Sequence, residues 1–327
     1  MDGTVILGGT GFLGPHAAAL ALARSRAAGS FARPLGPPVW AVGRTPDDAP
    51  RYGTPRDGVE WVQRDLEPEG AVEALLEELR PKRVLNCAAM ARVAACEQDP
   101  ERAVRLNLGV AGEAARWCGT RGARLVHVST DLVFGATEPP RPAGFREEDP
   151  PAPVSVYGDT KARGEAAVLE ACSAALVVRL PLLFGDSGGR GLGASDGLVA
   201  AVDQGERPRL FVDEWRTPLE VTQAARALVE CLGRSDTGLL HVAGSARTSR
   251  HALGLVILEE YGLPPDEARA CLEESRQAEV VAGGPRPPDT SLDAARAWRR
   301  LKSPLDDPRT ALRRALGGMA EAPGEGA

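Results

Sequence analysis

The 327-residue sequence has few aromatic residues, no long apolar run and no surplus of positive charge. Phe, Trp and Tyr make up 4% of the chain, whereas hydrophobic residues as a whole make up 43%, enough for a large folded core. Without a run of about 18 apolar residues, no membrane-spanning helix is expected. The formal net charge of −6 argues against a protein that binds nucleic acid or an anionic membrane through bulk charge.

Lysine and tyrosine are also scarce. Lysine occurs only at positions 82, 161 and 302, and tyrosine only at positions 52, 157 and 261, whereas arginine is abundant. A lysine or tyrosine that falls within a motif is therefore less likely to be there by chance.

The cysteines form no CxxC pair and have no histidine at the spacing of a metal site. Their even number allows disulfides, but free and mostly buried thiols in a reducing compartment explain the pattern better. An apolar strand pattern begins by Thr4, which leaves no room for a signal peptide, so a cytoplasmic protein is expected. The cysteines are Cys87, Cys96, Cys118, Cys172, Cys231 and Cys271.

Short apolar strands alternate strictly with helices over the first 180 residues. Because these strands are apolar on both faces and lack hairpin turns, they predict an α/β fold with a doubly wound parallel sheet and helices on both sides. The expected strands are 4–9, 39–44, 59–66, 83–89, 124–130 and 175–180. The expected helices follow the first strand and then cover 69–80, about 99–119 and 157–172.

The pattern loosens after residue 181. We expect strands within 209–219 and 238–244, helices near 220–233, 250–262 and 266–278, and a short helix from about Leu292. The predicted organisation is a dinucleotide-binding domain at 1–180 and a smaller substrate-binding lobe at 181–316, some of whose segments return to the sheet. Residues 317–327 are expected to be a disordered tail.

Three glycines lie between the first strand and the first helix. Gly8 would permit the tight turn, Gly11 would let a pyrophosphate approach the backbone, and Gly14 would let helix and strand pack closely. The free N–H groups of the helix N-terminus favour phosphate binding. A strand before the glycines and a helix after them make this a Rossmann-type NAD(P) site, although an ordinary glycine-rich turn is the alternative.

The end of the second strand indicates which cofactor binds. An acidic residue there would hold the ribose 2′-OH of NAD, but the strand ends in Gly43 and Arg44, with no carboxylate before Asp47. NADP (NADPH) is therefore favoured over NAD, unless Arg44 is an ordinary surface arginine. Asp65 after the third strand is a possible adenine neighbour, and helix capping explains it equally well.

Tyr157 and Lys161 stand four positions apart at the start of a helix, so their side chains share one face. An ammonium near a phenol favours the phenolate, which suits proton transfer. Thr130 ends the fifth strand, where its hydroxyl could donate a hydrogen bond to a substrate carbonyl. Asn107 could tie its helix to the Lys161 end through a water, or be a buried structural amide.

These motifs resemble those of the extended short-chain dehydrogenases/reductases, and within them the dTDP-4-dehydrorhamnose reductase family, over about residues 3–302. The superfamily marks are GGTGFLG, NCAA at 86–89, STDLVFG at 129–135, YGDTKARGE at 157–165 and VVRLPLLFG at 177–185. DEWRTPLEV at 213–221 and RPPDTSLD at 286–293 are more specific to the family.

The resemblance implies an NADPH-dependent reductase of a keto group on a nucleotide-linked deoxysugar. Tyr157 would be the general acid, Lys161 would hold the nicotinamide ribose, Thr130 would bind the substrate carbonyl, and Asn107 matches the family's helical asparagine. The resemblance further implies cofactor contacts from Thr10, Phe12, Leu13, Leu66, Ala88 and Ala89. It implies substrate contacts from Met90 and Asp131, and contacts with the substrate or where the lobes meet from Arg216, Thr217 and Pro218. Arg286 and Asp289 match the C-terminal motif and would contact the substrate near its nucleotide part.

Three positions depart from the family pattern. Leu132 and Met90 replace tyrosines, and Ala94 replaces an aspartate. These changes remove polar groups from the expected sugar pocket, so they favour a less polar or differently oriented substrate.

Other functions remain open. A nucleotide-sugar epimerase would keep its nicotinamide bound without net turnover. A dehydratase usually needs an acidic pair, and Thr130–Asp131 followed by Leu132 supplies only one carboxylate. The regulatory beta subunit of methionine adenosyltransferase resembles the same family, so a non-catalytic NADP-binding subunit is a third alternative.

The expected assembly is a possible homodimer through helices such as 99–119. No acidic cluster indicates a catalytic metal, and Glu147–Asp149 is expected to be a solvated loop.

Overall fold

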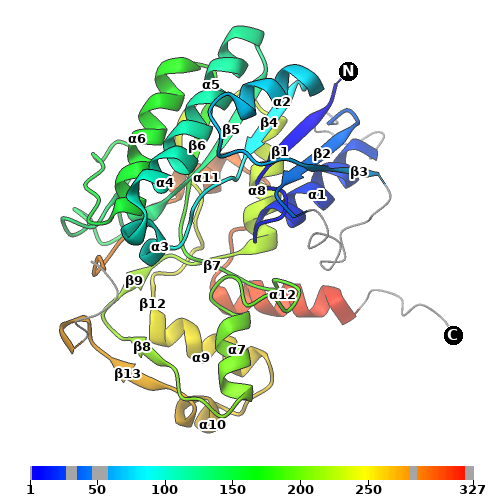
Figure 1. The fold of residues 1–327 in the computed structure, drawn as a ribbon. Coiled ribbons are helices and arrows are strands. Elements are labelled where there is room, and N and C mark those ends of the chain that lie inside the picture. Colours follow the sequence, from blue (N-terminus) through cyan, green and yellow to red (C-terminus); the bar gives the residue numbers. More distant parts are fainter. Residues whose placement is uncertain (1, 27–34, 46–57, 280–285, 321–327) are drawn as a thin grey trace, which may run out of the picture.

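A parallel sheet forms the centre of the molecule in the computed structural model, which describes residues 2–26, 35–45, 58–279 and 286–320 (Figure 1). The seven strands lie in the order β11-β6-β5-β4-β1-β2-β3, and every neighbouring pair is parallel. This order confirms the doubly wound α/β fold. The strands are β1 (Thr4–Leu7), β2 (Val39–Gly43), β3 (Val59–Gln63), β4 (Arg83–Asn86), β5 (Arg124–Thr130), β6 (Leu176–Leu180) and β11 (Gly238–His241).

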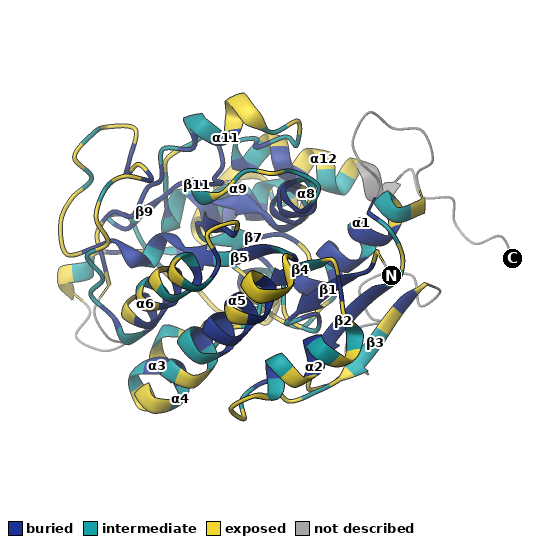
Figure 2. Ribbon diagram, turned by 90° about the horizontal axis from the view of Figure 1, so that it is seen from above, coloured by how far each residue is buried: buried dark blue, intermediate teal, exposed yellow. Residues whose placement is uncertain are grey.

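Helices cover both faces of the sheet (Figure 2). On one face lie α2 (Ala71–Leu79), α5 (Val110–Arg121) and α6 (Val156–Ala171). On the other lie α1 (Gly14–Arg26), α8 (Val221–Leu232) and α11 (Ala295–Arg300). Alternate strand residues therefore enter different cores, and both cores are buried, which explains the continuous apolar strands in the sequence.

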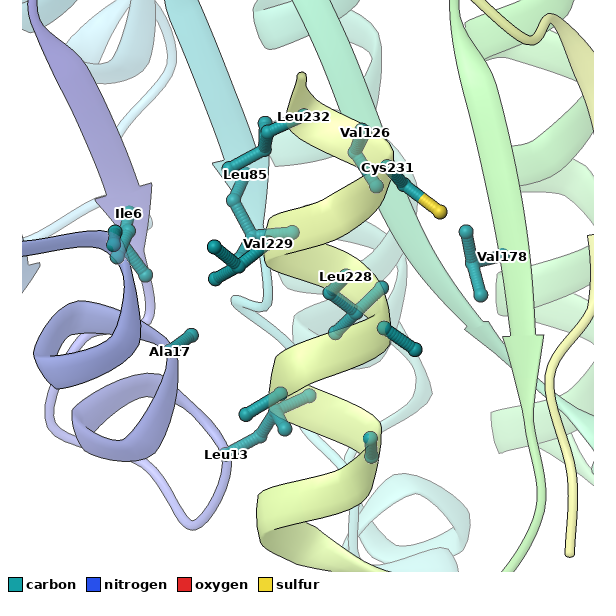
Figure 3. Packing of buried hydrophobic residues seen from close by; sticks show 14 of the residues in the cluster. Ile6, Leu13, Ala17, Leu85, Val126, Val178, Leu228, Val229, Cys231 and Leu232 are labelled. Atoms are coloured by element: carbon teal, nitrogen blue, oxygen red, sulfur yellow. The ribbon is translucent and has the colours of Figure 1, made fainter. Parts of the chain in front are cut away.

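The helix α8 comes late in the sequence but packs on the central sheet. Its residues Leu228, Val229 and Leu232 pack among strand residues such as Leu85 and Val126, as Figure 3 shows. The strand β11 likewise pairs with β6 and extends the sheet. The expected return of C-terminal segments to the sheet is thus present in the structure.

The remaining C-terminal residues form a smaller lobe beneath the carboxyl ends of the strands (Figure 1). Its short strands are β7 (Leu183–Phe184) paired with β10 (Leu219–Glu220), β8 (Arg209–Phe211) with β13 (Glu273–Ser275), and β9 (Trp215–Arg216) with β12 (Thr248–Ser249). Its helices are α7 (Asp196–Asp203), α9 (Arg250–Glu260), α10 (Pro265–Ala270) and α12 (Pro308–Ala320). Among the described residues, no helix is both long enough and apolar enough to span a membrane.

The helix expected at about 99–119 is instead a broken series. It consists of α3 (Val93–Gln98), α4 (Pro100–Val104), a π-helical turn at Arg105–Gly109 and α5. Pro100 begins a new helix, with Asp99 accepting a hydrogen bond from the Arg102 N–H as its cap. The π turn contains Asn107, and such turns are frequent at functional sites.

Three further expectations need correction. The helix expected at 266–278 ends at Ala270, because 273–275 pairs with β8 and tertiary pairing overrides local propensity. Residues 317–320, expected to belong to a disordered tail, are the last residues of α12, and 321–327 lies outside the described residues. Glu147 is 6% exposed and accepts a hydrogen bond from the His241 N–H at 3.1 Å, so it does not belong to a solvated loop.

Candidate active site

The three glycines form the turn that joins β1 to α1. Gly8 has φ +78°, a left-handed conformation that favours glycine. A Cβ atom at Gly8 would lie 2.7 Å from the Ala88 nitrogen, and one at Gly14 would overlap the Gly8 carbonyl oxygen. At Gly11 the nearest atom to such a Cβ is 3.3 Å away. Packing therefore requires glycine at 8 and 14, whereas Gly11 leaves the outer side of the turn open.

The other residues of the turn are divided between surface and core. Thr10 packs against the end of β2, because a Cβ atom at Gly43 would overlap its side chain. Phe12 is half-buried beside Gly193, and Leu13 is buried in the core. A ligand above this turn would therefore meet the Leu13 backbone rather than its side chain.

An arginine from the C-terminal lobe binds the same turn. Arg190 Nη1 donates to the Thr10 carbonyl at 2.9 Å, and its Nη2 donates to the Gly11 carbonyl at 2.8 Å. The loop that carries Arg190 is braced by Ser187, whose hydroxyl accepts from the Leu192 N–H at 3.1 Å. A guanidinium is thus fixed at the mouth of the glycine turn, a feature that the motif did not predict.

The residues expected near the adenosine end are placed as follows. Arg44 is exposed directly after β2, and its carbonyl oxygen accepts from Gln63 Nε2 at 3.0 Å. Asp65 is exposed and accepts from the Glu67 N–H at 3.1 Å, which is a local turn. Leu66 is 7% exposed. Asp47 lies outside the described residues.

Tyr157 lies in the first turn of α6, close to the end of β5. Ser155 caps this helix by accepting from the Gly158 N–H at 3.1 Å. A Cβ atom at Gly158 would overlap the Leu132 carbonyl oxygen, so this glycine allows α6 to approach the segment after β5. Tyr157 is 9% exposed. Burial raises its pKa, and a hydrogen bond with Thr130 opposes that rise.

Lys161 is one turn further along α6 and is 1% exposed. Its Nζ donates to the Val128 carbonyl at 2.7 Å and lies 3.4 Å from His127 Nε2. Burial lowers the pKa of Lys161 to about 8, against an opposing effect of Glu165. The structure thus brings Tyr157, Lys161 and Thr130 together at the carboxyl edge of the sheet.

Thr130 is engaged with Asp131, and Asp131 with the C-terminal lobe. The Thr130 hydroxyl donates to Asp131 Oδ1 at 3.2 Å and accepts from the Leu132 N–H at 3.2 Å. Asp131 Oδ2 accepts from the Thr290 hydroxyl at 2.9 Å and from Arg216 Nη1 at 3.3 Å. Burial raises the pKa of Asp131, while Arg216 lowers it. Asp131 is therefore a bound structural carboxylate, not a free acid.

Asn107 fixes the segment after β4 to α6. Its Oδ1 accepts from the Met90 N–H at 2.8 Å, and its Nδ2 donates to the Thr160 hydroxyl at 3.0 Å. It is fully buried. Asn107 therefore contacts the residue before Lys161 rather than Lys161 itself.

The surroundings of Tyr157 are apolar on one side. Met90 and Leu132 pack in the same cluster as the Tyr157 ring. Ala88 donates its N–H to Asn86 Oδ1 at 3.1 Å, and Ala89 is exposed beside it. Two of the three positions that depart from the family pattern therefore lie in the immediate neighbourhood of the phenol.

The remaining expected substrate residues lie where the lobes meet. Arg286 is half-exposed, 5.3 Å from the Phe211 ring centre and 3.6 Å from a Glu214 oxygen. Asp289 pairs with Arg247 at 2.6 Å. The Thr217 hydroxyl accepts from the Leu292 N–H at 3.1 Å, and the Pro218 carbonyl packs tightly on Gly244.

A pocket of about 310 Å³ opens in the C-terminal lobe, between α7, β8 and α9. Leu198, Leu210 and Gly254 give it an apolar lining, and Arg250 adds a cation. Burial lowers the pKa of Arg250, and Glu214 opposes this. A larger hollow of about 1130 Å³ lies at the amino ends of the strands. It is lined by residues such as Arg83 and Arg124 and by none of the catalytic candidates.

Two residues at this site were not expected from the motifs. His127 and Arg190 lie far from each other in sequence, and both contact a motif residue. His127 stands two residues before Ser129 in a predicted strand, so the two side chains share one face of the sheet. That alternation was a usable signal for the position of His127. No sequence signal indicated Arg190.

The chain is similar to known proteins over most of its length. The family model described as RmlD substrate binding domain matches residues 2–320. A dTDP-4-dehydrorhamnose reductase from Mycolicibacterium smegmatis is 32% identical over 251 residues, covering 74% of this chain and 72% of the relative. The methionine adenosyltransferase 2 subunit beta of Pongo abelii is 31% identical over 243 residues, covering 72% of this chain and 70% of the relative.

Among solved structures, a dTDP-4-dehydrorhamnose reductase from Bacillus anthracis in complex with NADP superposes with a TM-score of 0.76. It is 20% identical, and the match covers 97% of this chain and 99% of that one. At that identity the likeness supports the fold.

Proposed function

The chain belongs to the RmlD substrate-binding domain family, as its motifs indicated, and from that membership we propose that it is an NADPH-dependent reductase. The substrate would be a nucleotide-linked deoxysugar that carries a keto group. The observation that carries the proposal is the position of Tyr157: a buried phenol close to Thr130, one turn from Lys161, at the same sheet edge as the glycine turn.

The glycine turn fits a dinucleotide. Gly8 and Gly14 admit no side chain, and the outer side of Gly11 is open, so a pyrophosphate could approach the backbone and the α1 N-terminus. Arg190 would add a positive charge, and Arg44 would meet a 2′-phosphate. When bound, the nicotinamide cofactor supplies a hydride.

Residues of this chain would supply the proton that the substrate carbonyl oxygen takes up. The Thr130 hydroxyl would turn from Asp131 to donate to the substrate carbonyl oxygen, and Tyr157 would donate its phenolic proton to that oxygen. The ammonium form of Lys161, one helical turn away, would favour the resulting phenolate. The apolar Met90 and Leu132 beside Tyr157 favour a sugar with few hydroxyls on that side.

The pocket that contains Arg250 would take the nucleotide part of the substrate. A flat base suits the apolar lining, and a guanidinium suits a phosphate. The engagement of Asp131 by Arg216 and Thr290 removes the carboxylate that a dehydratase would need. A reductase is therefore favoured over a dehydratase.

The test is oxidation of NADPH and of NADH, followed at 340 nm, with a panel of nucleotide-linked 4-keto-6-deoxy sugars. Tyr157→Phe should lower kcat by about 10²-fold or more, because the general acid is lost. Tyr261→Phe is the matched control, since Tyr261 is 36% exposed at the end of α9. Turnover that survives in Tyr157→Phe would contradict the proposal.

A second function is favoured by the similarity to methionine adenosyltransferase 2 subunit beta. In that case the chain would bind NADP and a methionine adenosyltransferase subunit without turnover. Tight NADPH binding, no oxidation of NADPH across the panel, and a stable complex with such a subunit would support this alternative over the reductase.

A further inference from the structure

Three buried polar side chains form a row behind the catalytic tyrosine. Asn86 ends β4, His127 lies in β5 and Lys161 lies on α6, with exposures of 1%, 0% and 1%. Asn86 Nδ2 lies 3.1 Å from His127 Nδ1, and His127 Nε2 lies 3.4 Å from Lys161 Nζ. Each ring nitrogen of the histidine therefore has its own neighbour.

The backbone fixes which atom Asn86 presents to the histidine. The Ala88 N–H donates to Asn86 Oδ1 at 3.1 Å, so the amide oxygen is used there and the NH₂ group faces His127. An NH₂ group can only donate, so Nδ1 of His127 must carry a lone pair. Burial is the main cause that lowers the pKa of His127, and it acts whether or not Lys161 is charged, so the ring stays neutral. The single ring proton is then on Nε2, directed at Lys161.

That proton decides which form of Lys161 is satisfied. An ammonium group has only donors, so it would place a donor against the Nε2–H group. A neutral amine has a lone pair that accepts the Nε2–H, while one of its own N–H groups still donates to the Val128 carbonyl at 2.7 Å. The opposite tautomer of His127 would set its Nδ1–H against the Asn86 NH₂ group. If the amide turned over, the NH₂ group would instead meet the Ala88 N–H, so one pair of donors would still face each other.

We propose that Asn86 and His127 act together to favour the neutral amine of Lys161 over its ammonium in the folded protein. His127 is then a positioning residue, which acts on Tyr157 only through Lys161.

The other groups around the row leave this balance in place. Glu165, one turn along α6, is the carboxylate that favours the ammonium, but it is paired with Arg179 of β6 at 2.7 Å. The Cys87 thiol, directly after β4, adds little charge, because burial raises its pKa to about 12.

The charged residues of α5 have partners elsewhere. Glu113 accepts from the Gly70 N–H at 2.8 Å, and Arg116 pairs with Glu73 at 2.9 Å. Tyr157 on α6 is protonated, since burial raises its pKa. The direct neighbours of Lys161 therefore dominate, and they act in the same direction as the burial that lowers its pKa.

The effect of the Asn86–His127–Lys161 row on catalysis rests on the proposed function. A reductase needs the ammonium of Lys161 beside the phenolate that Tyr157 leaves behind. An amine that loses its proton near neutrality would confine activity to lower pH. The lysine chemistry itself is independent of any substrate and can be measured in the free protein.

The chain suits nuclear magnetic resonance, because it contains only three lysines and four histidines. We would label the full-length protein with [ε-¹³C]lysine and [ring-¹⁵N]histidine. Lys161→Met and His127→Gln would identify the two signals. The expected result is a ¹³C midpoint for Lys161 at least one pH unit below those of the exposed Lys82 and Lys302, with the His127 proton on Nε2.

Two variants test the coupling. Asn86→Asp keeps the shape and the acceptor for Ala88, but its second oxygen would draw the His127 proton to Nδ1 and turn a lone pair toward Lys161. Its Lys161 midpoint should rise by at least one unit. His127→Gln adds no charge, and its amide oxygen can turn to Lys161, so it should raise the midpoint as well.

The outcomes separate clearly. A wild-type His127 with its proton on Nδ1, or a Lys161 midpoint equal to those of Lys82 and Lys302, would overturn the proposal even if neither variant folds. A rise in Asn86→Asp alone would assign the effect to the added charge and would also overturn it. Because no cofactor or substrate is present, a failed reductase assay leaves this test unaffected.

Discussion

The Arg216 guanidinium lies 3.3 Å from the Asp131 carboxylate, and the two side chains are 8% and 4% exposed. Arg216 comes from the C-terminal lobe, whereas Asp131 directly follows Thr130 at the end of β5. The Thr290 hydroxyl bonds to both partners. The ion pair therefore joins the C-terminal lobe, which would bind the sugar, to Asp131. Asp131 is the neighbour of Thr130, the residue that would bind the carbonyl of the sugar.

Breaking this pair should destabilise the protein. Arg216→Met leaves the Asp131 carboxylate buried without its cation, which typically costs about 3–5 kcal/mol. Urea unfolding of the variant would measure the loss. Arg286→Met is the control, because Arg286 is half-exposed and should change the free energy of unfolding by less than about 1 kcal/mol. Equal losses in both variants would contradict the assignment.

Arg190 should contribute to cofactor affinity if the chain binds NADPH as proposed. Arg190→Ala removes the guanidinium that donates to the Thr10 and Gly11 carbonyls. Losing a charge-assisted contact of about 1.5–3 kcal/mol would raise the Kd for NADPH by roughly 10-fold or more. Fluorescence titration measures it. Arg207→Ala, a change on the far side of the C-terminal lobe, should leave the Kd unchanged.

The parallel sheet and the glycine turn were predictable because both depend on local patterns. Apolar runs on both faces indicated a parallel sheet, and Gly8 and Gly14 followed from the space that a turn into a helix allows. The four-residue spacing of Tyr157 and Lys161 likewise needs only a helix.

The contacts between distant segments were not predictable in this way. Arg190 reaches the glycine turn from 179 residues away, and nothing in its loop sequence indicates that approach. The strand β13 forms where a helix was expected, because its partner β8 lies elsewhere in the chain. Leu132 and Met90 were recognised as departures, but only packing shows that they surround Tyr157.

Gly158 should be essential for placing Tyr157. Alanine at this position would overlap the Leu132 carbonyl oxygen, so α6 would have to shift away from the end of β5. We expect Gly158→Ala to lose about 1–3 kcal/mol of stability and, if the chain is a reductase, to lower kcat. Calorimetry and the NADPH assay would measure the two effects.

The control for that change lies on the neighbouring helix. In Gly112→Ala the added Cβ would have only the end of the Arg116 side chain within contact distance, at 3.4 Å. Alanine there should stabilise α5 by up to about 1 kcal/mol, because glycine is a poor helix former. If both alanine variants were tolerated equally, the close approach at Gly158 would not position Tyr157.

The lowered pKa of Lys161 predicts a stability that increases with pH. Lys161 has a pKa of about 8 in the folded protein against 10.5 for an unperturbed lysine, so between these values the unfolded chain binds a proton that the folded protein does not. Stability must then fall as the pH drops from about 10.5 to 8, by roughly 3 kcal/mol in total.

Urea unfolding at pH 8 and at pH 10 in wild type, Lys161→Met and Lys302→Met would measure this effect. Lys161→Met removes the titrating group, so its free energy of unfolding should lose most of the increase with pH. Lys302 is exposed, so its variant should keep the wild-type slope. A wild-type slope in Lys161→Met would show that burial does not suppress proton binding at Lys161, and that its amine is as basic in the folded protein as in the unfolded chain.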